Sequence, residues 1–176
     1  TSSFGKSIPD LISSVGSVAG IKVDTGVKDL ANSSEEKITE GLDGLRERLK
    51  KYYELGARFT KWRAVYIINK NFPSKLSIHN NAHALARYAA LVQENGMVPI
   101  VEPEVLMDGD HDADLCLIKT SEVIKKCFEE LVTNKVDLSG IILKPNMILA
   151  GNQSKNKISN EEVSQKTIEC LKKSVP

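Results

Sequence analysis

Residues 98–105 read VPIVEPEV, a short run rich in Val and Pro that follows Gly96 closely and carries two acidic residues near its end. The β-branched residues and the preceding glycine predict a β-strand. Side chains two residues apart in a strand point to the same face, so Glu102 and Glu104 leave this strand on one side. Two like charges on one face need cationic partners from neighbouring segments.

Three further segments have a similar strand-like character, and helical segments separate the four. The predicted strands span 19–24, 59–67, 98–105 and 139–148, and the predicted helices span 42–56, 80–96, 112–134 and 159–175. Apolar residues at helical spacing and a closing glycine support the first of these helices. The repeated order of strand and then helix predicts a parallel sheet of the α/β class.

The remaining segments are expected to connect these elements within one domain, residues 1–176. Residues 1–18 are predicted to form a lead-in of loop and short helix, with the helix within 7–16. The polar segment 28–40 is predicted to be a surface loop. No low-complexity linker interrupts the series, so the sequence indicates no second domain.

Each predicted strand carries polar residues two apart near its C-terminal end. In an open sheet covered by helices on both faces, such pairs would meet an apolar helix layer. In a closed barrel they face a common mouth, which is where barrel enzymes hold their active sites. We therefore predict a (β/α)₈ TIM barrel, of which this chain covers about four βα units. The pairs are Lys22 with Asp24, Lys61 with Arg63, Glu102 with Glu104, and Lys144 with Asn146.

A complete barrel of this kind needs eight units and typically ~250 residues, whereas this chain of 176 residues supplies four. Four strands left open would expose the edges of an apolar sheet. The sequence therefore predicts that two copies complete a barrel or that the chain is part of a longer one.

The composition excludes several classes of protein. A net charge of +1 provides no general field that would attract nucleic acid or an anionic membrane. No apolar run approaches the ~20 residues of a membrane span, and the N-terminal TSSFGKSIPD lacks the features of a secretory signal. Three scattered cysteines argue against a disulfide framework and fit a reducing cytoplasm.

The chemistry of the predicted mouth follows from its charged side chains. A lysine that is crowded by other cations and partly desolvated loses its proton more easily, and a neutral amine forms a Schiff base with a carbonyl. Carboxylates can move the protons of that reaction, and Arg63 with Lys22 can hold a phosphate. The alternative is a purely structural ion-pair network. The mouth would collect Lys22, Lys61, Lys144, Arg63, Asp24, Glu102 and Glu104, with the lysines of the second and fourth strands neutralising the two glutamates.

Several longer stretches resemble one enzyme family. The stretches GIKVD, GLDGLRER, GARFTKWR, LARYAALVQENGMVPIVEPEVL, DGDHD and LKPNM are similar, in order and spacing, to class I fructose-bisphosphate aldolases from about Gly20 to Pro176. The resemblance implies a glycolytic lyase on a (β/α)₈ barrel that uses no metal and no other cofactor. It implies reversible cleavage of fructose 1,6-bisphosphate to dihydroxyacetone phosphate and glyceraldehyde 3-phosphate.

The resemblance implies a catalytic role for four residues of this chain. Lys144, in LKPNM, matches the Schiff-base lysine. Glu102, the first carboxylate of EPE, matches the group that moves protons while the carbinolamine forms and dehydrates. Glu104 matches the second carboxylate, which pairs with a lysine, and Lys61, in FTKWR, matches the lysine that assists catalysis beside the imine.

Three more residues are implied to contact the substrate or to lie beside it. Arg63 matches a contact to a substrate phosphate, Lys22 another basic group of the pocket, and Asp24 an acidic neighbour. The chain would correspond to strands three to six of the barrel. Further catalytic and phosphate-binding groups of the family are then expected on the other strands, and the isolated 176-residue chain is expected to be inactive.

The resemblance also implies partners and a location. Members of the family are cytoplasmic homotetramers, and GLDGL (41–45) resembles a stretch near a subunit interface. Members also associate with actin and with acidic tails of membrane adhesins, so a scaffold or binding role is the alternative to catalysis. A transaldolase-like barrel, which also forms Schiff bases, fits less well because the motifs KWR, EPE and KPNM are intact.

Three other features are assigned structural roles. Trp62 alternates with the two cations of its strand and is predicted to face outward into the helix layer. The acidic cluster DGDHD (108–112) is predicted to cap the helix that follows it. His79 and His83 lack the HExxH pattern of a zinc site and are predicted to form a surface or interface pair.

Overall fold

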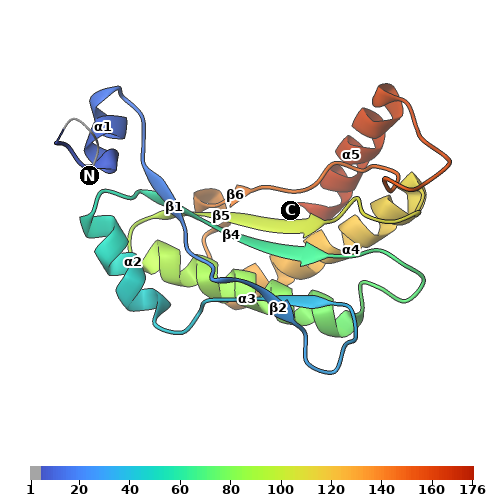
Figure 1. Cartoon of the computed structure of the whole chain (residues 1–176), viewed down its shortest axis with the longest axis horizontal. Helices are drawn as coiled ribbons and strands as arrows, with labels where there is room; N and C mark the ends of the chain where they lie inside the picture. Colours follow the sequence, from blue (N-terminus) through green and yellow to red (C-terminus); the bar gives the residue numbers. More distant parts are fainter. Residues whose placement is uncertain (1–4) are drawn as a thin grey trace.

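In the computed structural model, which describes residues 5–176, four parallel strands form one sheet in the order β1–β4–β5–β6 (Figure 1). The order of the strands in the sheet is their order along the chain, and each crossover contains a helix. This arrangement confirms the predicted α/β class. The strands are β1 (Gly20–Lys22), β4 (Phe59–Tyr66), β5 (Val98–Val105) and β6 (Ile142–Leu143).

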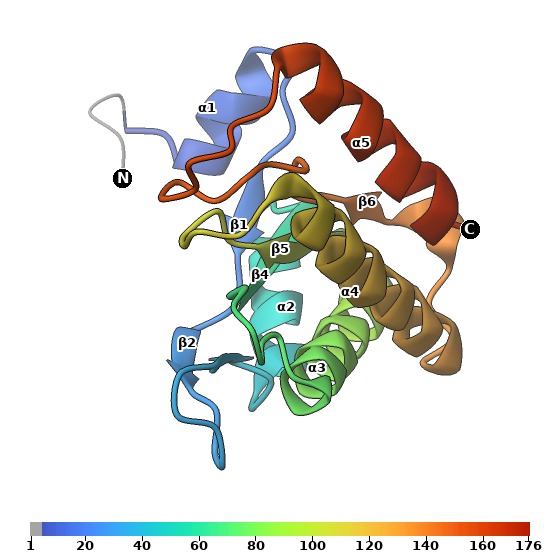
Figure 2. The same ribbon diagram turned by 90° about the vertical axis from the view of Figure 1, so that its right-hand side faces the viewer.

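The helices follow the strands along the chain, as the pattern predicted. Figure 2 shows α3, α4 and α5 gathered on one side of the strands, as in a wall of a barrel seen from its end. A short 3₁₀ turn, Leu138–Gly140, precedes β6, and the predicted lead-in helix is α1, although residues 1–4 lie outside the described part. The helices are α1 (Ile8–Ser14), α2 (Leu45–Glu54), α3 (Lys75–Glu94), α4 (Ala113–Thr133) and α5 (Asn160–Ser174).

Burial along β4 shows which face of the sheet meets the helices. Buried and half-buried residues alternate along the whole strand. Trp62 is fully buried, and its ring lies 5.4 Å from that of Tyr88 on α3. The Tyr88 hydroxyl is also 2.8 Å from the Thr60 hydroxyl, on the same face of β4. The prediction that Trp62 faces the helix layer is confirmed, and Lys61 and Arg63 therefore project from the opposite face.

We expect Trp62→Ala to lower the free energy of unfolding by about 3–5 kcal/mol, because the truncation leaves a cavity between β4 and α3 in a fully buried site. Urea denaturation followed by circular dichroism measures the change. Ile118→Ala on α4 is the matched control, because that side chain is 60% exposed and its loss leaves no cavity. Equal stabilities of the two variants would contradict this account of the core.

Side-chain caps set where the long helices begin. The Ser74 hydroxyl accepts from the Ser77 amide at the start of α3, so this helix begins five residues before the predicted 80. Asp112 caps α4 by accepting from the Leu115 amide at 2.8 Å, which confirms the capping role predicted for the acidic cluster. Such caps satisfy backbone donors that have no partner within the helix.

The prediction of a surface loop at 28–40 is wrong. Strand β2 (Gly26–Asp29) pairs antiparallel with β3 (Lys37–Glu40) to form a hairpin. Asn81 of α3 holds the hairpin from one side, since its amide donates to the Lys37 carbonyl at 2.9 Å and accepts from the Thr39 amide at 3.2 Å. The Thr39 hydroxyl donates to the Arg63 carbonyl on β4 at 2.7 Å. Hydrogen bonds to Asn81 and to the Arg63 carbonyl, both outside the segment, therefore hold this hairpin, and no apolar pattern within the segment predicts it.

The fourth strand is much shorter than the predicted 139–148. Only Ile142 and Leu143 pair with β5, and the Lys144 amide adds one more hydrogen bond, to the Val101 carbonyl at 2.9 Å. Pro145 then ends the pairing, since it has no N–H to donate. Lys144 therefore stands at the very end of the paired part of the strand.

Asn146 does not point to the same side as Lys144, contrary to the pattern predicted for this strand. Its amide nitrogen donates to the Thr120 hydroxyl on α4 at 3.1 Å, and its oxygen accepts from the Val105 amide at 3.0 Å. Because the strand has already ended, the two-residue periodicity no longer applies. Asn146 ties the ends of β5 and β6 to α4 instead of contributing to the mouth.

Among residues 5–176, no helix combines the length and the apolar character that crossing a membrane would require.

Candidate active site

Parallel pairing brings the polar ends of the strands to one edge of the sheet. Lys22 on β1 is the register partner of Lys61 on β4, and Arg63 is the partner of Glu102 on β5. On the other side of β5, Val101 pairs with Leu143, the residue before Lys144. The predicted residues therefore lie on adjacent strands. Lys22, Glu104 and Lys144 lie at or beside carboxyl ends, the end that carries the active site in barrel enzymes. Lys61 is only the third residue of β4, contrary to the prediction that it lies near the end of its strand.

Glu102 is the centre of the cluster, because two lysines from the neighbouring strands meet its carboxylate. Lys144 forms an ion pair and hydrogen bond with Oε1. Lys61 forms a second ion pair, with its Nζ 2.9 Å from Oε2. The Glu102 side chain is only 3% exposed, whereas Lys144 and Lys61 are 56% and 31% exposed. A buried carboxylate is thus shared between two cations that reach the open face.

The charge state of Glu102 follows from a balance of opposing effects. Burial would raise the pKa of its carboxyl, since a charge is costly away from water. The hydrogen bonds and charges of Lys144 and Lys61 outweigh burial, so the pKa lies below its ordinary value. Glu102 is therefore ionised at neutral pH, and it is placed to accept a proton from either lysine.

Glu104 pairs with an arginine and not with a lysine, which corrects the prediction. The Arg63 guanidinium donates from Nε to Glu104 Oε2. This hydrogen bond is the largest cause that raises the pKa of Arg63 above its ordinary value. Lys61 and Lys144 were predicted to neutralise both glutamates, but both form ion pairs with Glu102. Arg63 is the cation that pairs with Glu104.

Lys22 and Asp24 form a pair of their own at the end of β1. The Lys22 ammonium contacts the Asp24 carboxylate, which is 3% exposed. The same carboxylate accepts from the Gly26 amide at 3.0 Å, at the start of the hairpin. Asp24 thereby fixes the chain where it leaves β1 and keeps the half-exposed Lys22 at the edge of the mouth.

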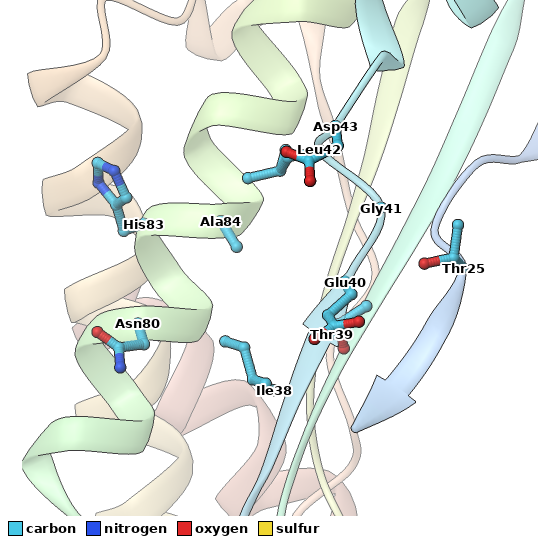
Figure 3. Close-up of a pocket in the computed structure, with 10 residues that line it drawn as sticks. All are labelled: Thr25, Ile38, Thr39, Glu40, Gly41, Leu42, Asp43, Asn80, His83 and Ala84. Atoms are coloured by element: carbon cyan, nitrogen blue, oxygen red, sulfur yellow. The ribbon is translucent and has the colours of Figure 1, made fainter. Parts of the chain in front are cut away.

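A pocket of about 540 Å³ lies outside this cluster, between β3, the loop 41–44 and α3 (Figure 3). None of the seven predicted site residues lines it. Figure 3 shows Ile38 and Thr39 on its hairpin wall and Asn80 and Ala84 on its helix wall. The pocket is therefore on the helix side of the molecule and not at the mouth.

His111 is a buried residue that the sequence did not single out as a side chain of interest. Only 6% of it is exposed, and neither ring nitrogen has a hydrogen-bond partner among residues 5–176. It lies where the loop after β5 meets the loop after β6, since the Gly151 amide donates to the His111 carbonyl at 2.8 Å. A side chain at position 151 would clash with the Gly109 carbonyl, 2.3 Å from an added Cβ. This contact joins the two loops that follow Glu102 and Lys144.

We expect His111 to make the protein lose stability as the pH falls. Burial lowers the pKa of His111, and this effect outweighs the nearby Asp110 and Asp112 carboxylates, which raise it. Below about pH 6.5 the unfolded chain therefore binds a proton that the folded chain resists. The stability that the neutral His111 contributes is fully present above that pH. It is lost as the pH falls toward the lowered pKa of His111 in the folded protein. Unfolding free energies measured at pH 7.5 and 5.5 should fall more steeply for the unaltered protein than for His111→Gln. Equal slopes would contradict the assignment.

Among residues 5–176, no group of three or more His, Cys, Asp and Glu side chains is arranged to hold a metal ion. The three cysteines are free and buried, and burial raises the pKa of Cys127 to about 12.

Comparison with known proteins agrees with this geometry. The family described as "Fructose-bisphosphate aldolase class-I" matches residues 1–176. Cytosolic fructose-bisphosphate aldolase 4 of Arabidopsis thaliana is 49% identical over 172 residues, which are 98% of this chain and 44% of the relative. A probable class 1 fructose-bisphosphate aldolase of Xanthomonas campestris is 53% identical over 161 residues, covering 92% of this chain and 48% of that one.

A solved structure has the same fold. It is fructose-bisphosphate aldolase from Plasmodium falciparum in complex with TRAP and a small molecule inhibitor, and it superposes with a TM-score of 0.97 at 43% identity. The match covers 100% of this chain and 51% of the other. The chain thus spans about half the length of the relatives that it matches.

The parallel strands, the helices on one side and the lysine–carboxylate cluster on the opposite face define a segment of a (β/α)₈ barrel enzyme. Its sequence is matched along the whole length by one family. The chain belongs to the class I fructose-bisphosphate aldolases.

Proposed function

We propose that the protein to which this chain belongs cleaves fructose 1,6-bisphosphate reversibly to dihydroxyacetone phosphate and glyceraldehyde 3-phosphate through a Schiff base on Lys144. The single observation that carries the proposal is the buried Glu102 carboxylate on β5, shared by Lys144 and Lys61 from the two neighbouring parallel strands. Membership of the family supports the same reaction. The proposal concerns the complete barrel, since the relatives are about twice as long.

Lys144 supplies the nucleophile. Its ammonium passes a proton to Glu102, with which it already forms a hydrogen bond. The free amine then attacks the ketone carbon of the sugar phosphate. One proton of the amine passes to the carbonyl oxygen, which becomes the hydroxyl of a neutral carbinolamine. Loss of this hydroxyl as water leaves a protonated imine, which accepts the electron pair released when the carbon–carbon bond breaks.

Glu102 moves the protons of these steps, and Lys61 keeps the charge balanced. The protonated Glu102 returns its proton to the departing hydroxyl, which leaves as water. Lys61 remains an ammonium 2.9 Å from the carboxylate. It stabilises the ionised form of Glu102 each time the proton has been given up. The two lysines thus have different roles although they touch the same group.

The other side chains of the mouth are proposed to bind and orient the substrate. Arg63 uses only Nε for Glu104, and its 43% exposed side chain has two further nitrogens that can donate to a phosphate. Lys22, whose side chain is 51% exposed, is a second basic group at the rim. Glu104 holds Arg63 in place, and Asp24 does so for Lys22.

We further propose the setting that the resemblance suggested: glycolysis, the cytoplasm and a homotetramer. The relatives of Arabidopsis thaliana are named as cytosolic. The loop 41–44, in the stretch that resembles a subunit interface, lines the open pocket of Figure 3. Light scattering on the purified protein tests the tetramer, and Asp43→Arg in that loop should lower the measured mass.

A binding role is the second candidate, because the Plasmodium falciparum aldolase was solved in complex with TRAP. The four cations and three carboxylates of the mouth leave an excess of one positive charge, which suits an acidic peptide such as the tail of an adhesin, or an acidic surface of actin. Titration with an acidic peptide at low and high salt tests this role. Binding that survives charge reversal at Arg63 and Lys22 would place the partner elsewhere.

Borohydride trapping tests the enzymatic proposal directly. The protein with its barrel complete is incubated with dihydroxyacetone phosphate and reduced, and the labelled peptide is identified by mass spectrometry. We expect one label per chain, on Lys144. Label at another lysine, or no label, would overturn the proposal.

The polypeptide of residues 1–176 alone is expected to show no measurable cleavage of fructose 1,6-bisphosphate. Its cluster lies on the face of the sheet opposite the helices, and four strands cannot enclose that face. A coupled assay that detects the triose phosphates measures the rate. Turnover near that of a complete barrel would show that the other strands are not needed.

A further inference from the structure

Two histidines on the outer helix layer meet the same buried carboxylate. His79 and His83 lie one turn apart on α3, and Glu130 reaches them from the neighbouring α4. The Nδ1 atom of His79 is 3.4 Å from Glu130 Oε1, and that of His83 is 3.2 Å from Oε2. The Glu130 side chain is only 8% exposed. This convergence lies between helices and was not visible in the sequence, which places Glu130 far along the chain.

The carboxylate selects one tautomer for His83. An ionised carboxylate accepts hydrogen bonds, so the Nδ1 atom of His83 carries the proton that it donates, whereas the Nδ1 atom of His79 lies only within ion-pair range of the same group. The lone pair of a neutral ring is then on Nε2. Within residues 5–176 neither Nε2 has a hydrogen-bond partner. The side chains of His79 and His83 are 58% and 48% exposed, so both lone pairs are accessible to solvent.

The rings are arranged side by side. Their centroids are 6.3 Å apart, and their planes differ by 22°. A bound metal ion requires each nitrogen at ~2.0–2.1 Å, so both rings would have to turn about their side-chain torsions to bring their Nε2 atoms to one ion. Two histidines four residues apart on a helix can ligate one ion from a single face. Figure 3 shows the ring of His83 directed away from the pocket wall formed by Ile38.

The buried Glu130 carboxylate also has a cationic partner on its own helix. Lys126 Nζ lies 2.9 Å from Oε1 on the same helix. Lys126 thus keeps the carboxylate ionised. It also places a positive charge near the two rings, which limits how tightly they hold a cation.

We propose that His79 and His83 bind one borderline divalent transition-metal ion, such as Zn²⁺ or Ni²⁺, through their Nε2 atoms, with Glu130 as the carboxylate that orients both rings. Histidine ligands in metal sites commonly donate the other ring N–H to a carboxylate, which fixes the tautomer and makes the ligand nitrogen more basic. Imidazole suits these metals. Water completes the coordination, so the site is a two-residue chelate, distinct from the lysine mouth on the other face of the sheet.

Binding would link two helices of the outer layer. The metal joins two turns of α3, and the carboxylate behind the rings belongs to α4. The ion is therefore expected to favour the packed arrangement of the two helices without touching Lys144 or Glu102. This separation allows binding to be measured independently of catalysis.

Isothermal titration of the purified protein with Ni²⁺ tests the proposal, with His79→Gln, His83→Gln and Glu130→Gln as variants. We expect one ion per chain and at least a tenfold weaker affinity when either histidine is replaced, because a chelate then becomes a single ligand. Glu130→Gln should weaken binding by about 10–100-fold, as loss of a supporting carboxylate commonly does. Unchanged affinity in either histidine variant would overturn the site.

Glu129→Gln is the matched control, since Glu129 contacts Lys126 but neither ring. It should bind Ni²⁺ as the unaltered protein does. Nitrogen-15 spectra of the unaltered protein with Zn²⁺ give a second readout that does not depend on any variant folding. The Nε2 resonances of two rings should shift while the protons on Nδ1 are retained. Shifts at His111 instead, or at no ring, would contradict the proposal.

Discussion

Lys144→Arg in the complete enzyme is expected to abolish borohydride-trappable imine and to lower kcat by a factor on the order of 10⁴ or more. Arginine keeps the positive charge and much of the length of lysine, so the ion pair with Glu102 can persist. The guanidinium does not lose its proton in proteins and cannot attack a carbonyl. The loss is therefore chemical and not a consequence of a missing charge.

The measurement separates these two effects. Steady-state kinetics give kcat, and mass spectrometry after reduction reports the imine. Lys50→Arg, on the exposed face of α2, is the matched control and should leave both readouts unchanged. Substantial turnover by the Lys144 variant would mean that another lysine forms the Schiff base, and Lys61 would be the first to examine because it meets the same carboxylate.

Glu102→Gln is expected to lower kcat by about 10²–10⁴-fold, the usual contribution of a positioned acid–base group. The amide has nearly the shape of the carboxyl group but neither accepts a proton from Lys144 nor donates one to the departing hydroxyl. The two lysines also lose their shared counter-charge. Formation of the imine should therefore slow, while the affinity for substrate phosphate, which depends on other side chains, should change little.

Single-turnover experiments with borohydride test whether imine formation slows while the affinity for substrate phosphate stays the same. The rate at which label accumulates should fall together with kcat, and KM should stay within a few-fold of its original value. Glu94→Gln removes a surface ion pair with Arg46 and is the control for loss of one carboxylate elsewhere. An unchanged rate of labelling in the Glu102 variant would assign the proton transfers to another group.

Much of the central sheet could be predicted from the sequence because β-branched residues alternate with charges there. The bounds of β5 agree with the predicted 98–105, and Trp62 faces the helices as its position between Lys61 and Arg63 indicated. Alternation fixes the face from which a side chain leaves a strand. It therefore also predicted that lysines from neighbouring strands would meet a glutamate of β5.

Alternation does not fix which cation a carboxylate selects. Arg63 is the register partner of Glu102, yet its long side chain extends along the strand to Glu104. That choice depends on side-chain torsions and on the space left by the lysines. The β2–β3 hairpin was missed for a related reason, since Asn81, which anchors it, is distant in sequence. The short β6 was missed because strand propensity continues past Leu143 although pairing stops.

The carboxylate of Glu102 contacts two ammonium groups, one of which is consumed in the proposed reaction. Transfer of a proton from Lys144 to Glu102 leaves the total charge of the three groups at +1, and no ion has to enter or leave to compensate. The net charge of the site is thus the same before and after imine formation, because water leaves as a neutral molecule. The phosphate-binding groups therefore face the same total charge at each step, so the binding of the substrate phosphates need not weaken while its covalent bonds change.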